Sequence, residues 1–209
     1  FRRVLFRSTV YTFGQVIGTH AEGFDRGSGP VVTSGAGLAG SIGLAPGSSI
    51  FTWTQYPFNW NDPSFESITF NMDYQTNASG QFDDDRMGWM TEDSNATSTY
   101  FFGVQLDHSD GGIVTYWRDS GNTRIQTPIV ELTALSANAW YRLTTIITKI
   151  GDTSAQIDVS LVALDSSGNP TGTTYSGSVA DTSLWQDGAP NLDYFTATSM
   201  YPAFKNHNA

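Results

Sequence analysis

The sequence predicts an all-β fold, namely an antiparallel two-sheet β-sandwich or jelly roll. In residues 67–74, SITFNMDY, polar and apolar side chains alternate without a break, which is the pattern of a strand with one buried and one solvated face. Aromatic residues make up 13% of the chain and charged residues only 14%, so large rings are available to fill the space between two sheets. The 21 glycines and 8 prolines supply the turns that many short strands require.

The expected strands follow one another between turn signals. Short apolar pieces at 10–13 and 38–44 predict weak strands, and an aromatic loop at 51–65 leads into a strand at 66–76. Pro128 interrupts a later apolar piece, and since proline cannot donate to a sheet ladder, we expect an edge strand there. From their alternation and their β-branched and aromatic content, four strands are expected after the acidic run 83–85, at 86–91, 99–107, 112–118 and 125–132.

The strongest expected hairpin joins residues 139–150 to residues 154–165. Both segments are dense in β-branched and apolar residues, and Gly151 and Asp152 provide a turn between them. A further turn leads into strands at 173–179 and 194–204. About ten to twelve short strands separated by turns are typical of a large sandwich or jelly roll.

The acidic balance of the chain limits its partners. The formal net charge is −10, from 20 acidic and 10 basic residues, and 16 of the acidic residues are aspartate. Such a surface repels phosphate backbones, so we expect no nucleic-acid partner. No apolar run approaches the length that crosses a bilayer, so we expect no membrane span. There are no cysteines, which excludes disulfides and thiolate metal sites.

The first eight residues, FRRVLFRS, differ in character from residues 9–209. They hold three of the ten basic residues and share no pattern with the remainder of the chain. They match what common sequencing-adapter DNA encodes, so we expect residues 1–8 to be a non-native leader, a sequencing artefact, and residues 9–209 to form a single domain. Without them, 7 basic residues stand against 20 acidic ones, a net charge of −13.

The second half of the chain resembles a known superfamily. The run Trp140-Tyr141-Arg142-Leu143 with its long strand, its hairpin and the turn DSSGNP at 165–170 is similar to concanavalin A-like lectins and glucanases, and more narrowly to laminin-G-like domains of bacterial envelope or secreted proteins. The ending MYPAF at 200–204 is similar to the penultimate strand of such domains, so we expect truncation at the C-terminus. The resemblance implies the sandwich fold and a core position for Trp140. Lectins, adhesins, hydrolases and lyases share this fold.

A catalytic site is not indicated by the carboxylates. Glycoside hydrolysis needs two carboxyl groups facing each other across the scissile bond. None of the four glutamates begins the Glu-x-Asp-x-x-Glu arrangement of glucanases on this fold. A pair assembled from separate strands stays open as an alternative. No Gly-x-Ser-x-Gly motif occurs, which argues against an α/β-hydrolase.

Calcium is the metal that the acidic loops favour. Hard carboxylate oxygens on flexible loops suit Ca²⁺, and two loops that a sandwich could bring together carry them. The alternative is that these are solvated turn carboxylates, with Arg86 as a local counter-charge. The candidate ligands are Asp83, Asp84, Asp85, Asp107 and Asp110.

Carbohydrate binding would use aromatic rings that stack on sugar faces and polar groups that bind hydroxyls. We expect Trp60, between Asn59 and Asn61, to be an exposed ring. On one strand Tyr116 and Trp117 must face opposite ways, so at most one of them is a platform; core packing is the alternative for each ring. The candidate binding residues are Trp53, Tyr56, Trp60, Trp89, Trp117 and Arg118.

Together these features predict a non-catalytic carbohydrate-binding or adhesion module of a larger extracellular or cell-envelope protein, with a glycan partner and with calcium as the candidate metal. Two alternatives stay open. One is a polysaccharide-degrading enzyme, either a glycoside hydrolase or a lyase, on the same fold. The other is a structural spacer domain.

Overall fold

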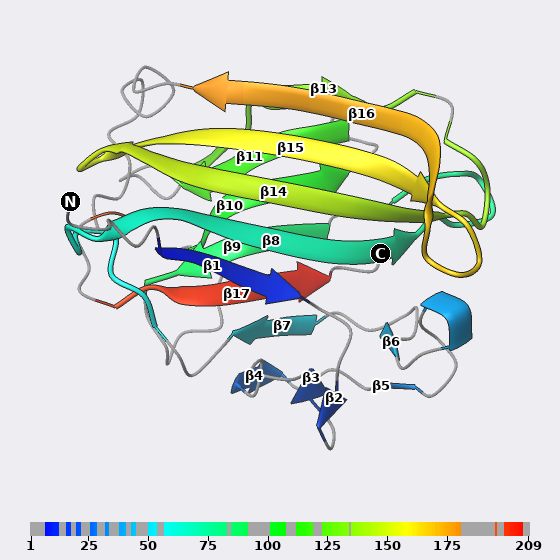
Figure 1. Ribbon diagram of the computed structural model, residues 1–209, viewed down its shortest axis with the longest axis horizontal. Helices are drawn as coiled ribbons and strands as arrows, with labels where there is room; N and C mark the ends of the chain where they lie inside the picture. The colour runs from blue at the N-terminus through cyan, green and yellow to red at the C-terminus, as the bar shows by residue number, and fades with distance from the viewer. Residues whose placement is uncertain are drawn as a thin grey trace, which may run out of the picture.

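Two antiparallel sheets stacked face to face form the protein (Figure 1), as the sequence predicts. The computed structural model describes residues 7–12, 16–17, 20–21, 26–28, 32–33, 38–40, 43–44, 50–53, 57–82, 85–91, 101–107, 112–118, 123–133, 135–180, 195 and 199–206. The smaller sheet has five strands, in the order β1 (Arg7–Thr12), β8 (Phe65–Gln75), β14 (Trp140–Gly151), β15 (Ser154–Leu164) and β16 (Pro170–Ala180).

The larger sheet lies behind the smaller one in Figure 1. Its path is β12 (Arg124–Ile125), β11 (Gly112–Arg118), β10 (Phe101–Asp107), β9 (Asp85–Met90), β17 (Tyr201–Asn206), β7 (Ile50–Trp53) and β4 (Arg26–Ser28), and β13 (Pro128–Glu131) pairs with β11 beside β12. Two small ladders join β2 (Val16–Ile17) to β3 (His20–Ala21) and β5 (Val32–Thr33) to β6 (Gly43–Leu44), and a 3-10 turn covers Leu38–Gly40.

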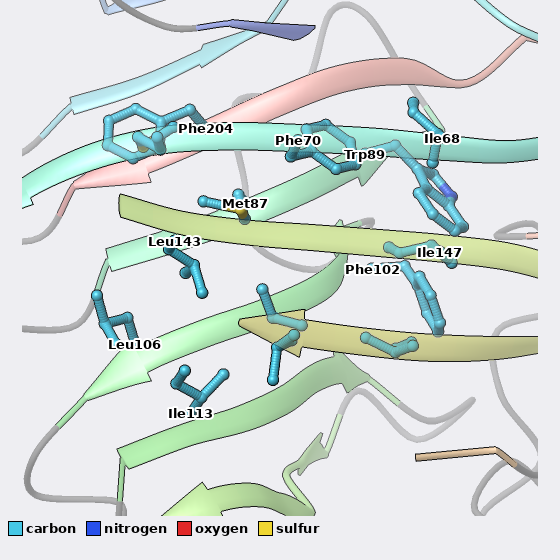
Figure 2. Close-up of a cluster of buried hydrophobic side chains, with 14 of the residues drawn as sticks. Ile68, Phe70, Met87, Trp89, Phe102, Leu106, Ile113, Leu143, Ile147 and Phe204 are labelled. Carbon is cyan, nitrogen blue, oxygen red and sulfur yellow. The ribbon is translucent and has the colours of Figure 1, made fainter. Parts of the chain in front are cut away.

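The strand predicted at 66–76 is confirmed as β8. Its side chains alternate between buried and partly exposed, and Ile68, Phe70, Met72 and Tyr74 are all buried. They face the larger sheet. Figure 2 shows these inward side chains of β8 and β14 meeting those of β9, β10 and β11. At about 25 cal/mol for each Å² of apolar surface removed from water, this shared interior is the main stabilising term of the fold.

The predicted hairpin is confirmed as β14 and β15, which pair along almost their whole length. The next turn is held by a carboxylate. Asp165 accepts hydrogen bonds from the backbone N–H groups of Ser167 (2.8 Å) and Asn169 (2.9 Å), and Gly168 has a positive φ of 87°, which glycine tolerates best. The bonds from Asn169 and Ser167 lower the pKa of Asp165. This turn connects β15 to β16.

The edge strands agree in part with prediction. Pro128 begins β13, and within the described residues this strand pairs with β11 alone, so its predicted edge position is confirmed. At one edge of the smaller sheet, β1 pairs with β8 in parallel, whereas the other strand pairs of this sheet are antiparallel. Arg7 and Ser8, which belong to the expected leader, are part of β1.

The two sheets meet along one side of the sandwich, where β13 of the larger sheet lies beside β16 of the smaller one (Figure 1). The hydroxyl of Tyr175 donates a hydrogen bond to the carbonyl of Thr133. A Cβ atom added at Gly177 would collide with the carbonyl oxygen of Ile129. We call this contact the seam; it depends on glycine because the two backbones approach too closely for a side chain.

Candidate functional site

Three of the tryptophans expected to bind sugar, Trp60, Trp89 and Trp117, lie inside the core. Trp60, expected to be exposed, has an exposed fraction of 0%, so that expectation is wrong. Its ring packs against Trp89 (5.6 Å between centroids) and Phe195 (5.2 Å), and its indole N–H donates to the carbonyl of Gly151 (3.3 Å). A ring packed on several sides by other aromatic rings cannot stack on a sugar in this conformation.

Trp89 and Trp117 are also fully buried, on the inner side of the larger sheet. Tyr116 belongs to a separate buried cluster with Phe101, so the prediction that Tyr116 and Trp117 face opposite ways is confirmed. Both are interior residues, which leaves neither as a surface platform. Arg118 ends β11 and is partly buried.

Other predicted residues are only partly described. Trp53 lies in β7, where its backbone pairs with Ala203 and Arg26, but its side chain is outside the described set. Tyr56 also lies outside the described residues, as do three of the predicted calcium ligands, Asp83, Asp84 and Asp110.

The two described calcium candidates do not share a site. Asp85 pairs directly across from Leu106, which points into the core. Asp107 is the next residue along β10, so its side chain leaves the opposite face of the sheet. Within the described ranges, no group of three or more His, Cys, Asp or Glu residues gathers closely enough to hold a metal ion.

A buried polar network lies on the outer face of the larger sheet. The Nε of Arg86 donates to Oε1 of Gln105 (3.0 Å), and Nε2 of Gln105 donates to Oδ2 of Asp107 (2.9 Å). The guanidinium carbon of Arg86 lies 4.0 Å from the ring centroid of Tyr116, a cation–π geometry. Every one of these side chains is at least nine-tenths buried. The network therefore satisfies a buried charge and presents no open surface to a ligand.

The outer face of the smaller sheet is solvated, and it carries a second set of hydrogen-bonded polar side chains. We call it the open face; it consists of the side chains of β8, β14, β15 and β16 that point away from the core. Its members are Ser67, Thr69, Asn71, Asp73, Gln75, Trp140, Arg142, Thr144, Ile146, Thr148, Ile150, Gln156, Asp158, Ser160, Val162, Leu164, Thr174, Ser176, Ser178 and Ala180. Hydroxyl and amide side chains predominate.

Trp140 stands on the open face. Tyr141, Leu143 and Ile147 alternate with it and point into the core, so Trp140 must point outward. The expected core position of Trp140 is therefore wrong. Among the tryptophans whose side chains the structure describes, only Trp140 is not fully buried. The alternation of its strand was the signal that could have revealed it.

Polar pairs continue from Trp140 along β8 and β14. Arg142 donates to both carboxylate oxygens of Asp73, from Nε (2.7 Å) and from an η nitrogen (2.8 Å). This hydrogen bond is the main cause that raises the pKa of Arg142. One pair further on, the Thr144 hydroxyl bonds Oδ1 of Asn71 (2.7 Å). These bonds hold the side chains in fixed positions, which reduces the entropy that a bound ligand would cost.

Comparison with protein-family models, with curated proteins and with solved structures found no match. The protein is therefore classified by its fold alone, as an all-β antiparallel sandwich. In the part of the chain that is described, no helix has the length and apolar character needed to cross a bilayer.

Proposed function

We propose that this protein is a non-catalytic carbohydrate-binding domain and that it binds through the open face around Trp140. The observation that carries the proposal is the position of this indole. It lies on a solvated sheet surface, next to a bidentate ion pair and an ordered amide–hydroxyl pair. Indole faces stack on the apolar faces of sugar rings, while neighbouring polar groups bind the hydroxyls.

The surroundings of Trp140 suit a ligand that is polar but not strongly charged. Its cross-strand neighbour on β8 is Gln75, an exposed amide, and its neighbour on β15 is Leu164, which is buried. Trp140 therefore has an aliphatic neighbour across one side of its strand and an amide across the other, which together offer an apolar surface and hydrogen-bonding groups. That combination matches the amphipathic character of a pyranose ring.

This function fits an extracellular or cell-envelope setting and the resemblance of residues 140–170 to laminin-G-like domains, and both stay part of the proposal. Calcium stays a prediction that concerns other residues, since the charged members of the open face are Asp73, Arg142 and Asp158. We expect binding at Trp140 to persist in a chelator.

The direct test is affinity electrophoresis and pull-down on a panel of soluble and insoluble polysaccharides, with Trp140→Ala beside the unchanged protein. Truncating a tryptophan that anchors a ligand typically costs about 2 kcal/mol or more, so we expect at least a roughly tenfold loss of affinity. Ile150→Ala is the matched control, because Ile150 lies on the same strand and is 50% exposed, at the opposite end of β14. Binding that is equally strong in Trp140→Ala would contradict the proposal.

A further inference from the structure

We infer that the ligand of the open face is a neutral polysaccharide chain that lies along the β8–β14 strand pair. This inference rests on the proposed function and assigns it a substrate class and a binding direction. Two independent properties of the open face carry it: the way its charges are paired, and the order of its side chains along the two strands.

The described charges on the open face do not favour an acidic polymer, because the one cation is paired with a carboxylate. Among the side chains of the open face that the structure describes, Arg142 is the single cation, and its Nε and one of its η nitrogens are bound to the two carboxylate oxygens of Asp73. Asp158 accepts two bonds from Nε2 of Gln156, each of 3.0 Å, and an amide does not neutralise its charge. Asp165 follows Leu164, the β15 neighbour of Trp140, and its lowered pKa keeps it ionised.

The negative charge of the whole chain also repels an acidic polymer at long range. The chain carries a net charge of −10, so a polyuronate or a sulfated glycan would be repelled as it approached. A neutral polymer meets no such barrier, and its hydroxyl groups can use the donors and acceptors that the ion pair and the amides expose. Charge complementarity therefore selects uncharged sugars.

The order of side chains along β8 and β14 defines a direction. Successive cross-strand pairs are Gln75 with Trp140, Asp73 with Arg142, and Asn71 with Thr144. Residues on one face of a strand are two apart, so neighbouring pairs are about 6.7 Å apart and the three pairs span about 13 Å. An extended chain that stacks on Trp140 and runs parallel to the strands passes over the two polar pairs one after the other.

The last of these pairs keeps hydrogen-bonding capacity for a ligand. The bond between Thr144 and Asn71 uses the amide oxygen Oδ1 of Asn71. The amide nitrogen has two N–H donors, and the bond from Thr144 uses neither of them. Asn71 is partly exposed, so its N–H groups can donate to sugar hydroxyls about 13 Å along the chain from the ring stacked on Trp140.

The test measures binding of neutral polymers (hydroxyethylcellulose, galactomannan, mixed-linkage β-glucan) and acidic ones (alginate, polygalacturonate). It uses the unchanged protein, Trp140→Ala and Asn71→Ala, with Ser176→Ala as control on β16 of the same face. We expect neutral polymers to bind, Trp140→Ala to lose about tenfold or more, and Asn71→Ala to lose about threefold to tenfold, as one hydrogen bond of about 1 kcal/mol predicts. Affinity should change little between about 0.05 and about 0.5 M NaCl. Thermal unfolding of each variant checks that it is folded.

The outcomes separate the substrate class from the proposed function. Acidic polymers that bind more tightly than neutral ones, with loss in Trp140→Ala, would overturn the substrate class and leave the proposed function standing. Neutral binding that depends on Trp140 but not on Asn71 would overturn the direction along β8 and β14. Binding of no polymer at all would overturn the proposed function together with the inference.

Discussion

Thr145 and its neighbour Thr144 give opposite predictions for the same substitution. Thr145 points into the core between Phe70 and Val159, its partners across the sheet, and its exposed fraction is 0%. Its hydroxyl has no hydrogen-bond partner among the residues that the structure describes. Thr144 points to the open face, where its hydroxyl bonds Asn71. Replacing each in turn by valine exchanges a hydroxyl for a methyl group of similar size.

Thr145→Val is expected to stabilise the protein. A buried hydroxyl without a partner costs about 1–3 kcal/mol, and the valine methyl occupies the same space, so no cavity offsets the gain. We expect about 1–2 kcal/mol of added stability, or roughly 2–4 °C in Tm for each kcal/mol in a chain of this size. Thr144→Val should instead lose about 0.5–1 kcal/mol, the usual net value of one hydrogen bond.

The assay is urea unfolding monitored by tryptophan fluorescence, with the free energy extrapolated to water and the slope compared between variants. An unchanged slope shows that the midpoint shift reports stability. If Thr145→Val destabilises the protein by about 1 kcal/mol or more, the hydroxyl is hydrogen-bonded and the assignment of Thr145 to a dry interior is wrong.

Two further predictions concern the core and the seam. Burial, and then the nearby charge of Asp85, raise the pKa of Tyr74 well above its usual value of 10.0, so stability should be complete below about pH 10 and fall as the pH rises beyond it. In Tyr74→Phe, the free energy of unfolding in urea should decrease less between about pH 8 and about pH 11 than in the unchanged protein. An equal decrease in both proteins would contradict the raised pKa of Tyr74. Gly177→Ala should cost about 1–3 kcal/mol through its collision with Ile129, whereas Ser176→Ala should stay within about 0.5 kcal/mol of the unchanged protein; thermal unfolding measures both, and equal effects would refute the close approach.

The strands were predictable because their signal is local. The alternation around Ile68 and the dense β-branched content of residues 140–150 are visible within one segment, and both segments form strands in the structure. The pairing of β1 with β8 in parallel had no such signal. Which strand lies next to which depends on contacts between distant parts of the chain.

The site was harder to predict, and Trp60 shows why. Its polar neighbours Asn59 and Asn61 are indeed exposed, but the ring itself is covered by Trp89 and Phe195, which come from distant parts of the sequence. The polar residues of this loop therefore predicted correctly that it lies at the surface, but they did not predict that its tryptophan side chain points into the core.

Trp140 shows the opposite case, in which the signal is local. The period of two in β14 places Trp140 opposite Tyr141, so its outward direction is a property of its own strand, whereas the resemblance pointed to the core. The positions of the acidic residues could not be predicted from a single segment. The separation of Asp85 from Asp107 depends on the register between β9 and β10, which neither strand reveals by itself.

The seam between β13 and β16 affects how the protein behaves at high concentration. A sheet edge that is left uncovered offers unpaired N–H and C=O groups to strands of other molecules, which is a common route to aggregation. Here the close approach at Gly177 and the hydrogen bond from Tyr175 to Thr133 place another part of the same chain against that edge. The contact that closes this side of the sandwich thereby also obstructs intermolecular strand addition along β16.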